Sequence, residues 1–554
     1  MTSSSETDTR SDARIDDVSE RRASAARSRK SDSSILDLRT TQGQILFLII
    51  SIALSLLIQS LPNDAVRKIF NLDGSNNAIN NDAKKHQHHH HRLHSNECIV
   101  STPLINNNET EKRPTYWIYS RNGNEKHLKH VINVVDRLGY SKVTNETDNW
   151  DLLWAHDYPF RALYPKMHHL KPHQRVNHFP GCGFITNKVD LATTESKYVP
   201  KSFRLPEDRE KFMNYIELNP KTLFVQKNNQ HRHINIKSVN EINFNDNGTF
   251  LQEYVDNPLL VDGHKFDIGV YVIITSIDPL RVYIYKGDIL FRYCPQKYYP
   301  FDPKNVDKYI VGDDYLPVWD VPSLSTFYNG FRFGMKDSFD AYLRSKERDP
   351  SIIWPQVEDA IRSILLLKEK HIINAMKQYR NKRNFFEMMR FDLIIDDNLR
   401  VYLMEANMSP NLSSSHFQQN TLLYEQVIYN LLSLVGIGSS IYRESLRTRT
   451  NDVEQMMSSD KNIAVFAEHC ASGRCSESCE YDKCKVCRPC LSSQDIADLH
   501  TAYREHINRG DTKRIFPVAM TENEKPTLEN LSEKNRWMTN WFAGKCLMDS
   551  TWCS

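Results

Sequence analysis

The sequence predicts an α/β protein of mixed sheets and helices, and two kinds of pattern indicate it. Segments rich in Val, Ile, Tyr and Phe, such as 116–119 and 265–274, are typical of strands. Other segments repeat apolar residues at helical spacing, first over 130–138 and most clearly from Trp354 to Ile372. A proline at position 355 suits the first turn of that second helix, where its missing N–H does no harm. We expect folded structure to begin near residue 115.

Length and charge narrow the classes of protein further. The chain has 554 residues, enough for roughly three domains of about 150 residues. Lys and Arg total 71 against 69 Asp and Glu, a formal net charge of +2. This balance argues against a generally basic nucleic-acid binder, so we expect no nucleic-acid partner and look for local charged patches instead.

Three segments precede the predicted folded region. Residues 1–44 are rich in Ser, Asp and Arg, and are expected to be disordered. Residues 45–61 carry no charge and reach the short limit for crossing a bilayer. A buried core helix is the alternative, but the polar flanks favour a transmembrane anchor. Residues 62–114 form a polar stem whose histidine run, 88–91, is more typical of a solvated tract than of a metal site.

Basic residues near the predicted anchor suggest an orientation. More of them precede the segment than follow it, which favours a cytoplasmic N-terminus. The preceding ones are Arg27, Arg29, Lys30 and Arg39, and the following ones are Arg67 and Lys68. We therefore expect a single-pass membrane protein whose body lies in the lumen of the secretory pathway.

The first segment that suggests chemistry is the strand 222–227, which ends in Lys227. A polar loop follows over 228–234 and contains Arg232. A lysine at a strand end beside such a loop suits the neutralisation of phosphates. A solvated lysine is the plainer alternative.

The second is the strand 265–274. By alternation, Lys265, Asp267 and Gly269 share one face. Lys265 and Asp267 could form a cross-strand ion pair, or they could line a nucleotide site. The strand 281–285 is expected to turn into 289–293 as a hairpin and to bring Arg292 to the same sheet.

The third segment, 386–407, is the most specific, because two apolar strands flank a turn at 397–400. If Asp396 pairs with Val401, Asp392 lies opposite Glu405, and Asn407 shares their face. Opposed carboxylates repel each other unless a cation compensates them, and with an amide oxygen beside them they suit Mg²⁺. The alternative is a protonated or solvated pair at a sheet edge.

Taken together, these motifs resemble the tubulin tyrosine ligase-like family over about residues 115–440. The motifs that match in order and spacing are Asn177-His-Phe-Pro180, Lys188-Val-Asp-Leu191, Tyr198-Val-Pro-Lys-Ser-Phe-Arg-Leu-Pro206, Lys227, Gln252-Glu-Tyr-Val255, Asn257-Pro-Leu-Leu260, Lys265-Phe-Asp267, Phe391-Asp392 and Glu405-Ala-Asn-Met-Ser-Pro-Asn-Leu412. The resemblance implies an ATP-grasp fold that holds ATP and Mg²⁺ between two α/β lobes.

The resemblance also implies roles for individual residues. Lys188, Lys227, Arg232 and Lys265 would contact phosphates; Gln252, Tyr254 and Val255 would form the adenine side; Asp267 would hold the ribose side; Asp392, Glu405 and Asn407 would hold Mg²⁺; Lys265 and Arg292 would act in catalysis. The implied reaction adds free glutamate to a protein carboxylate through an acyl-phosphate. The implied partner is tubulin or the microtubule, through its acidic C-terminal tails, as for a tubulin polyglutamylase.

Three departures from the family pattern favour a second interpretation. The family has an arginine two residues after the Asp of Lys-Phe-Asp, where this chain has Gly269. Losing one such cation typically costs about 3 kcal/mol, roughly two orders of magnitude in rate. The glycine-rich loop is replaced over 231–234, and the His-Leu-Thr-Asn element expected after Tyr299 is replaced over 308–314. The alternative is a weakly active or inactive nucleotide-binding pseudoenzyme of the secretory pathway.

The C-terminal extension, 441–554, contains a cysteine-rich module at 470–490. Its spacing allows either disulfides or zinc, and the predicted membrane anchor favours disulfides. The cysteines of the extension are Cys470, Cys475, Cys479, Cys484, Cys487, Cys490, Cys546 and Cys553. The basic residues that could meet acidic tubulin tails are Arg443, Arg447 and Arg449, or Arg380, Lys382 and Arg383.

Overall fold

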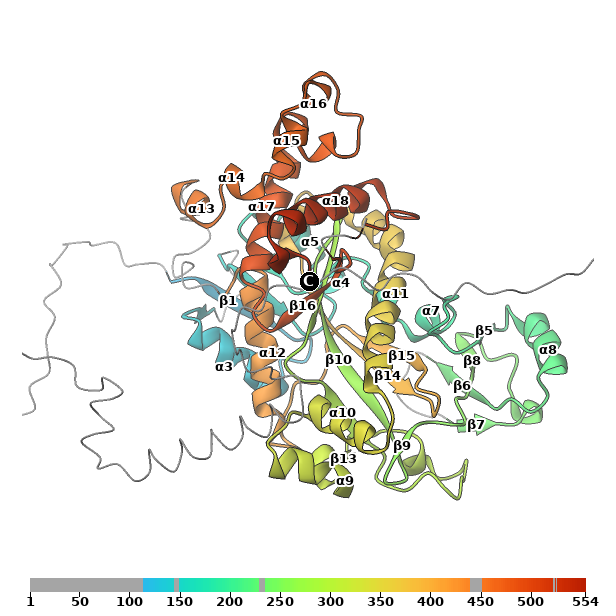
Figure 1. Ribbon diagram of the computed structural model, residues 1–554. Helices are drawn as coiled ribbons and strands as arrows, with labels where there is room; N and C mark the ends of the chain where they lie inside the picture. The colour runs from blue at the N-terminus through green and yellow to red at the C-terminus, as the bar shows by residue number, and fades with distance from the viewer. Residues whose placement is uncertain (1–112, 144–148, 229–234, 439–450, 522–523, 525) are drawn as a thin grey trace, which may run out of the picture. The chain divides into compact units, whose positions relative to one another are not determined.

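The computed structural model describes residues 113–143, 149–228, 235–438, 451–521, 524 and 526–554 (Figure 1). The predicted N-terminal tail, the predicted anchor at 45–61 and nearly all of the predicted stem, with its histidine run, lie outside these residues. So does Arg232.

The predicted localisation needs correction. Among the helices of the described ranges, none has both the length and the apolar character that crossing a bilayer requires. The prediction of a single-pass membrane protein with a lumenal body is therefore not borne out by any helix of the described ranges.

A four-stranded parallel sheet opens the described chain, with the strand order β2-β1-β3-β4. The strands are β1 (Thr115–Tyr119), β2 (Ser141–Lys142), β3 (Leu152–Ala155) and β4 (Arg175–Val176). Helix α3 (Lys129–Arg137) buries Val131, Val134 and Val135, which lie on one helical face. The strand and the helix that the sequence predicted at this end are therefore confirmed.

The second sheet is antiparallel, with the strand order β5-β8-β6-β7. Its strands are β5 (Ser202–Leu205), β6 (Phe224–Asn228), β7 (Asn235–Lys237) and β8 (Thr249–Glu253). Helix α8 (Arg209–Leu218) contributes Phe212 to a small core with Phe203, Phe224 and Leu251. The predicted strand 222–227 is β6, and Lys227 lies near its end.

The central sheet is built around β10 (His264–Ile277), a strand of 14 residues that runs through the middle of Figure 1. Its other strands are β9 (Leu260–Val261), β11 (Leu280–Tyr285), β12 (Leu290–Tyr293), β13 (Leu316–Pro317), β14 (Glu387–Ile395), β15 (Val401–Asn407) and β16 (Thr512–Phe516). Every residue of β14 is buried. Such burial explains why its sequence is a nearly continuous apolar run rather than an alternating one.

The predicted hairpin between 281–285 and 289–293 is not formed. Strand β11 pairs with β10 at Val272–Ile277, whereas β12 pairs with β10 at Phe266–Gly269. Since β14 occupies the other edge of β10, the two strands follow one another along a single edge. A long β10 can accept two partners end to end, so neighbouring strands in sequence need not pair with each other.

Three longer helices complete the main body: α10 (Met335–Ser345), α11 (Ile353–Met376) and α12 (Asn420–Leu434). Helix α11 confirms the predicted helix that begins around Trp354, and it buries Val357, Ile361 and Ile364. The shorter helices are α4 (Pro159–Ala162), α5 (Tyr164–His168), α6 (Gly183–Thr186), α7 (Lys188–Ala192), α9 (Pro322–Ser325), α13 (Asn451–Met457), α14 (Asp460–Ile463), α15 (Ala467–Cys470) and α16 (Gly473–Glu477).

The C-terminal extension is joined to the central sheet. Its strand β16 pairs antiparallel with β11 and adds Ile515 and Phe516 to the main core. Helices α17 (Ser493–Ile507) and α18 (Glu533–Met548) form a second core rich in tryptophan. Figure 1 shows both helices near β16.

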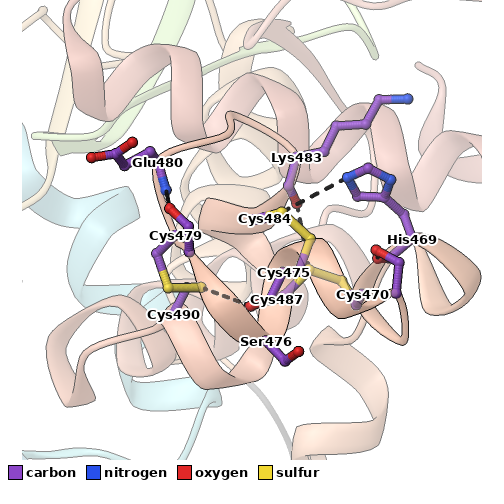
Figure 2. Close-up of a disulfide and its surroundings, with 12 residues drawn as sticks. His469, Cys470, Cys475, Ser476, Cys479, Glu480, Lys483, Cys484, Cys487 and Cys490 are labelled. Atoms are coloured by element: carbon purple, nitrogen blue, oxygen red, sulfur yellow. Dashed lines mark hydrogen bonds between the residues drawn. A yellow bond between two sulfur atoms is a disulfide. The ribbon is translucent and has the colours of Figure 1, made fainter.

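The cysteine-rich module contains disulfides, as predicted. Figure 2 shows three of them gathered in one small module, Cys470–Cys487, Cys475–Cys484 and Cys479–Cys490. A fourth, Cys546–Cys553, lies at the end of the chain. The disulfide alternative is therefore confirmed over zinc.

Candidate functional site

One cavity of about 700 Å³ is lined by residues of the antiparallel sheet and the central sheet. All of the predicted site residues that the structure describes lie in its wall. These are Lys188, Lys227, Gln252, Tyr254, Val255, Lys265, Asp267, Arg292, Asp392, Glu405 and Asn407. Residues distant in sequence therefore converge on a single space.

The two predicted carboxylates are cross-strand partners. Asp392 on β14 pairs with Glu405 on β15, and Arg390 pairs with Asn407. Nearer the turn, Val401 pairs with Ile395 rather than with Asp396, so the pairing assumed from the sequence is wrong there. An irregularity after Asp392 leaves Met404 as an extra residue on β15 and brings Asp392 opposite Glu405.

Basic side chains of the protein compensate both carboxylates. Arg390 donates from Nε and Nη2 to the two Asp392 oxygens at 2.6 and 2.8 Å, and Arg292 Nη2 lies 3.2 Å from Oδ2. Burial alone would raise the pKa of Asp392, but the two guanidinium groups outweigh it and hold that pKa below its ordinary value. Glu405 pairs with Lys188 at 3.1 Å. The positive charge that the sequence predicted to compensate the two carboxylates is therefore supplied in this structure by basic side chains of the protein.

Asp267 and Arg292 form a second bidentate pair. They are direct partners between β10 and β12, and Arg292 donates to both Asp267 oxygens at 2.8 Å. Burial raises the pKa of Asp267, with Arg292 opposing the shift. Asp267 thus forms a cross-strand ion pair, but with Arg292 rather than with Lys265, and both residues of the pair line the cavity. Asp267, Arg292, Asp392 and Arg390 form a continuous chain of alternating charge.

Lysines from three different elements face the same cavity. Burial lowers the pKa of Lys265 to about 8, and its Nζ lies 3.3 Å from the Tyr254 hydroxyl. Burial, together with Lys188 and Lys265, lowers the pKa of Lys227 to about 8, and Lys227 donates to Gln252 Oε1 at 2.9 Å. Lys188 is the first residue of α7, which Asn187 caps. Lysines that repel one another in this way favour a bound anion.

Arg390 is a cavity residue that was not predicted from the sequence. It lies two residues before Asp392, so strand alternation alone could have placed it on the same face. Its guanidinium lies next to Gly269: a Cβ added to that glycine would be 2.8 Å from Arg390 Cδ and 3.2 Å from Nε. The space left at Gly269 is therefore occupied by an arginine from the neighbouring strand.

The segment 309–313, where the family pattern expects a His-Leu-Thr-Asn element, also lines the cavity. Tyr309 packs edge-on against Tyr254, and Phe301 lies against both rings. This aromatic cluster backs the cavity on the side of Gln252, Tyr254 and Val255.

A separate buried group could be mistaken for a metal site. His178, Cys182 and Glu387 bring their ligand atoms close together. However, His178 Nδ1 bonds Glu387 at 2.7 Å, and Nε2 bonds the carbonyl oxygen of Ala155 at 2.8 Å. Because both ring nitrogens of His178 bond protein atoms, we interpret the group as a structural link between β14 and the parallel sheet rather than as a metal site.

The predicted basic surface is partly neutralised within the protein. Lys382 pairs with Asp278 at 2.7 Å and Arg383 with Asp498 at 3.0 Å. The other predicted set, Arg443, Arg447 and Arg449, lies outside the described residues.

Comparisons with known proteins show which family the sequence matches. The model of the tubulin-tyrosine ligase family matches residues 166–442. The chain is 39% identical over 480 residues to the probable tubulin polyglutamylase ttll-15 of Caenorhabditis elegans, covering 82% of this chain and 91% of that protein. It is 25% identical over 360 residues to the human tubulin polyglutamylase TTLL7, and 27% identical over 319 residues to the mouse tubulin monoglutamylase TTLL4.

Coverage differs among these relatives. The matches take in 60% and 53% of this chain, but only 40% of human TTLL7 and 26% of mouse TTLL4. What is shared with those two proteins is therefore a part of each.

Proposed function

Because this chain belongs to the tubulin-tyrosine ligase family, we propose that it is an ATP-dependent ligase that adds glutamate to protein carboxylates. The acceptor we propose is tubulin, through the acidic side chains of its C-terminal tails. The names of the relatives, all tubulin glutamylases, support this substrate class.

One observation carries the proposal: an acid–acid–amide group and several lysines meet in a single cavity. Lys188, Lys227 and Lys265 would contact the phosphates of ATP. Gln252, Tyr254 and Val255 would bind on the adenine side, where the cluster of aromatic rings lies. Asp267 would hold the ribose side. A cavity of about 700 Å³ lies in the range typical of small-molecule sites.

The donor set fits Mg²⁺. Asp392 and Glu405 offer carboxylate oxygens from directly opposed positions, and Asn407 offers an amide oxygen on the same strand as Glu405. Hard oxygen ligands of this kind, few in number and beside phosphate groups, are what Mg²⁺ prefers. Bound there, Mg²⁺ would neutralise phosphate charge. Asn407 Nδ2 also donates to Asp392 Oδ2 at 3.2 Å, which orients the two side chains relative to each other.

The proposed reaction has two steps. A carboxylate oxygen of the acceptor attacks the terminal phosphorus of ATP, and the bond between that phosphorus and the bridging oxygen breaks. ADP leaves, and the acceptor carboxylate has become an acyl-phosphate. The amine of free glutamate then attacks the acyl carbon, phosphate leaves, an amide bond forms, and the amine proton passes to solvent. Lys265 and Arg292 would offset the negative charge on the transferred group, because fixed cations in a partly buried site act with little reorganisation.

A weakly active or inactive pseudoenzyme is not favoured. That alternative depended in part on the missing cation at Gly269, and a guanidinium lies beside that residue. The relatives are also named as a probable tubulin polyglutamylase and a tubulin polyglutamylase.

The test is ATP-dependent incorporation of labelled glutamate into microtubules by the full chain. The Glu405→Gln variant should lose at least about 100-fold in rate, because it removes a metal ligand and leaves the phosphates poorly neutralised. Glu533→Gln is the matched control, since the Glu533 side chain is 73% exposed and lies outside the cavity. Equal rates for the wild type and Glu405→Gln, or no incorporation by the wild type into any tubulin, would overturn the proposal.

A further inference from the structure

Gly269 lies in the middle of a regular strand, and its neighbours explain why it is a glycine. It pairs with Asp392 across β10 and β14, and Tyr271, two residues on, pairs with Arg390. The backbone at Gly269 does not adopt a left-handed conformation, so no turn or bulge requires it. A Cβ would meet the Arg390 side chain at 2.8, 3.2 and 3.4 Å. The glycine is therefore required for space, and Arg390 fills that space.

Arg390 lies in the wall of the cavity. Only 7% of the residue is exposed, although it lines the cavity. Nε and Nη2 bond Asp392, and within the described part of the chain Nη1 donates to no protein atom. A guanidinium carries five N–H groups in a fixed fork, so donors remain for an anion beside Asp392.

We propose that Arg390 contacts the transferred phosphoryl group and that Gly269 is the residue that admits it. The inference rests on the proposed ligase function. The resemblance places an arginine at position 269 of β10, whereas this chain supplies a guanidinium to the same place from β14. Arg390 forms no covalent bond in either step; it stabilises charge on the phosphoryl oxygens as the bridging bond breaks.

If Arg390 only oriented Asp392, its presence would be less well explained. Arg292 and Asn407 already bond the Oδ2 atom of Asp392, each at 3.2 Å. A second guanidinium is needed less for holding Asp392 than for delivering positive charge to the anion that binds beside it.

A swap of the two positions tests the proposal. In Arg390→Gly, kcat for glutamate incorporation should fall by about 100-fold, with the KM for glutamate little changed, as for loss of one transition-state donor. Gly269→Arg alone should be at least as impaired, because Arg390 occupies the space its side chain needs. The double variant should recover to within about 10-fold of the wild type, since one guanidinium again reaches the site.

Arg390→Lys separates charge from geometry. It keeps the positive charge but loses the planar fork, so its kcat should lie between those of the wild type and Arg390→Gly. The proposal is overturned if Arg390→Gly keeps kcat within 2-fold of the wild type, or if the double variant is no better than Arg390→Gly.

A second measurement needs no enzymatic turnover. Gly269→Ala should lower the denaturant midpoint in the wild-type background, where the new methyl group meets Arg390. In the Arg390→Gly background it should leave the midpoint unchanged or raise it, because alanine is then accommodated. Equal losses in both backgrounds would overturn the steric coupling even if the wild type proved inactive. Conversely, an active wild type with normal Arg390→Gly turnover refutes the role of Arg390 and leaves the ligase function standing.

Discussion

Arg281 on β11 donates from Nε and Nη2 to both carboxylate oxygens of Glu505 on α17, at 2.8 and 3.0 Å. Both side chains are only 3% exposed. The pair joins the central sheet to a part of the chain beyond the family-matched region, which ends at residue 442. Together with β16, it makes the C-terminal extension part of the same folded body.

Breaking this pair should destabilise the whole domain. In Glu505→Gln, the Arg281 guanidinium stays buried with its charge uncompensated, which typically costs about 3–5 kcal/mol. The free energy of unfolding, from denaturant titration of the full chain, measures this. Glu533→Gln is the control, because its pair with Lys485 is largely exposed and worth at most about 1 kcal/mol. Similar losses of unfolding free energy in the two variants would contradict the conclusion that the C-terminal extension is part of the same folded body.

ATP affinity should fall as the pH rises from 7 to 9. Lys265 has a pKa of about 8 in the ligand-free protein, lowered chiefly by burial. Phosphate binds the protonated lysine, so at pH 7 the charge is present and at pH 9 only about a tenth of it remains. This lysine alone should weaken binding by up to about 10-fold across that range, as measured by calorimetry with Mg²⁺ present.

The Lys265→Met variant separates this lysine from the other titrating groups. It should bind ATP more weakly at pH 7 and show a flatter pH profile than the wild type. An identical slope in the two proteins would show that Lys265 does not carry the dependence.

The disulfides should stabilise the C-terminal module. Replacing Cys470 and Cys487 together by Ser opens a loop with a sequence separation of 17, and typically costs about 3 kcal/mol. A reductant should lower the unfolding midpoint of the wild type, whereas a metal chelator should leave it unchanged. The reverse response, with sensitivity to the chelator alone, would indicate zinc.

The alternation of residues along two neighbouring strands was enough to predict that Asp392 and Glu405 lie opposite each other. Strand alternation put Asp392, Glu405 and Asn407 on one face, and the apolar residues around them indicated burial, which is complete in β14 and partial in β15. The register near the turn was wrong by one residue, and the extra residue at Met404 corrected it. A bulge of this kind has no reliable signal in a single sequence.

Closeness in the sequence led to a wrong prediction of strand pairing, because the single strand β10 pairs with several other strands. Segments 281–285 and 289–293 have the lengths and spacing of a hairpin, yet each pairs with a different half of β10. The hydrophobic pattern records that a strand is buried, but it does not record which strand lies beside it.

The sequence by itself determined the α/β class, the family, the residues that could bind nucleotide and metal, and a cysteine module suited to disulfides, because these depend on residue type and short-range spacing. Only the tertiary structure decided that Arg390 lies in the space left at Gly269, and that Arg281 binds Glu505 across the boundary of the family-matched region. Both relationships join residues far apart in the chain, and such contacts arise from the packing of whole strands and helices.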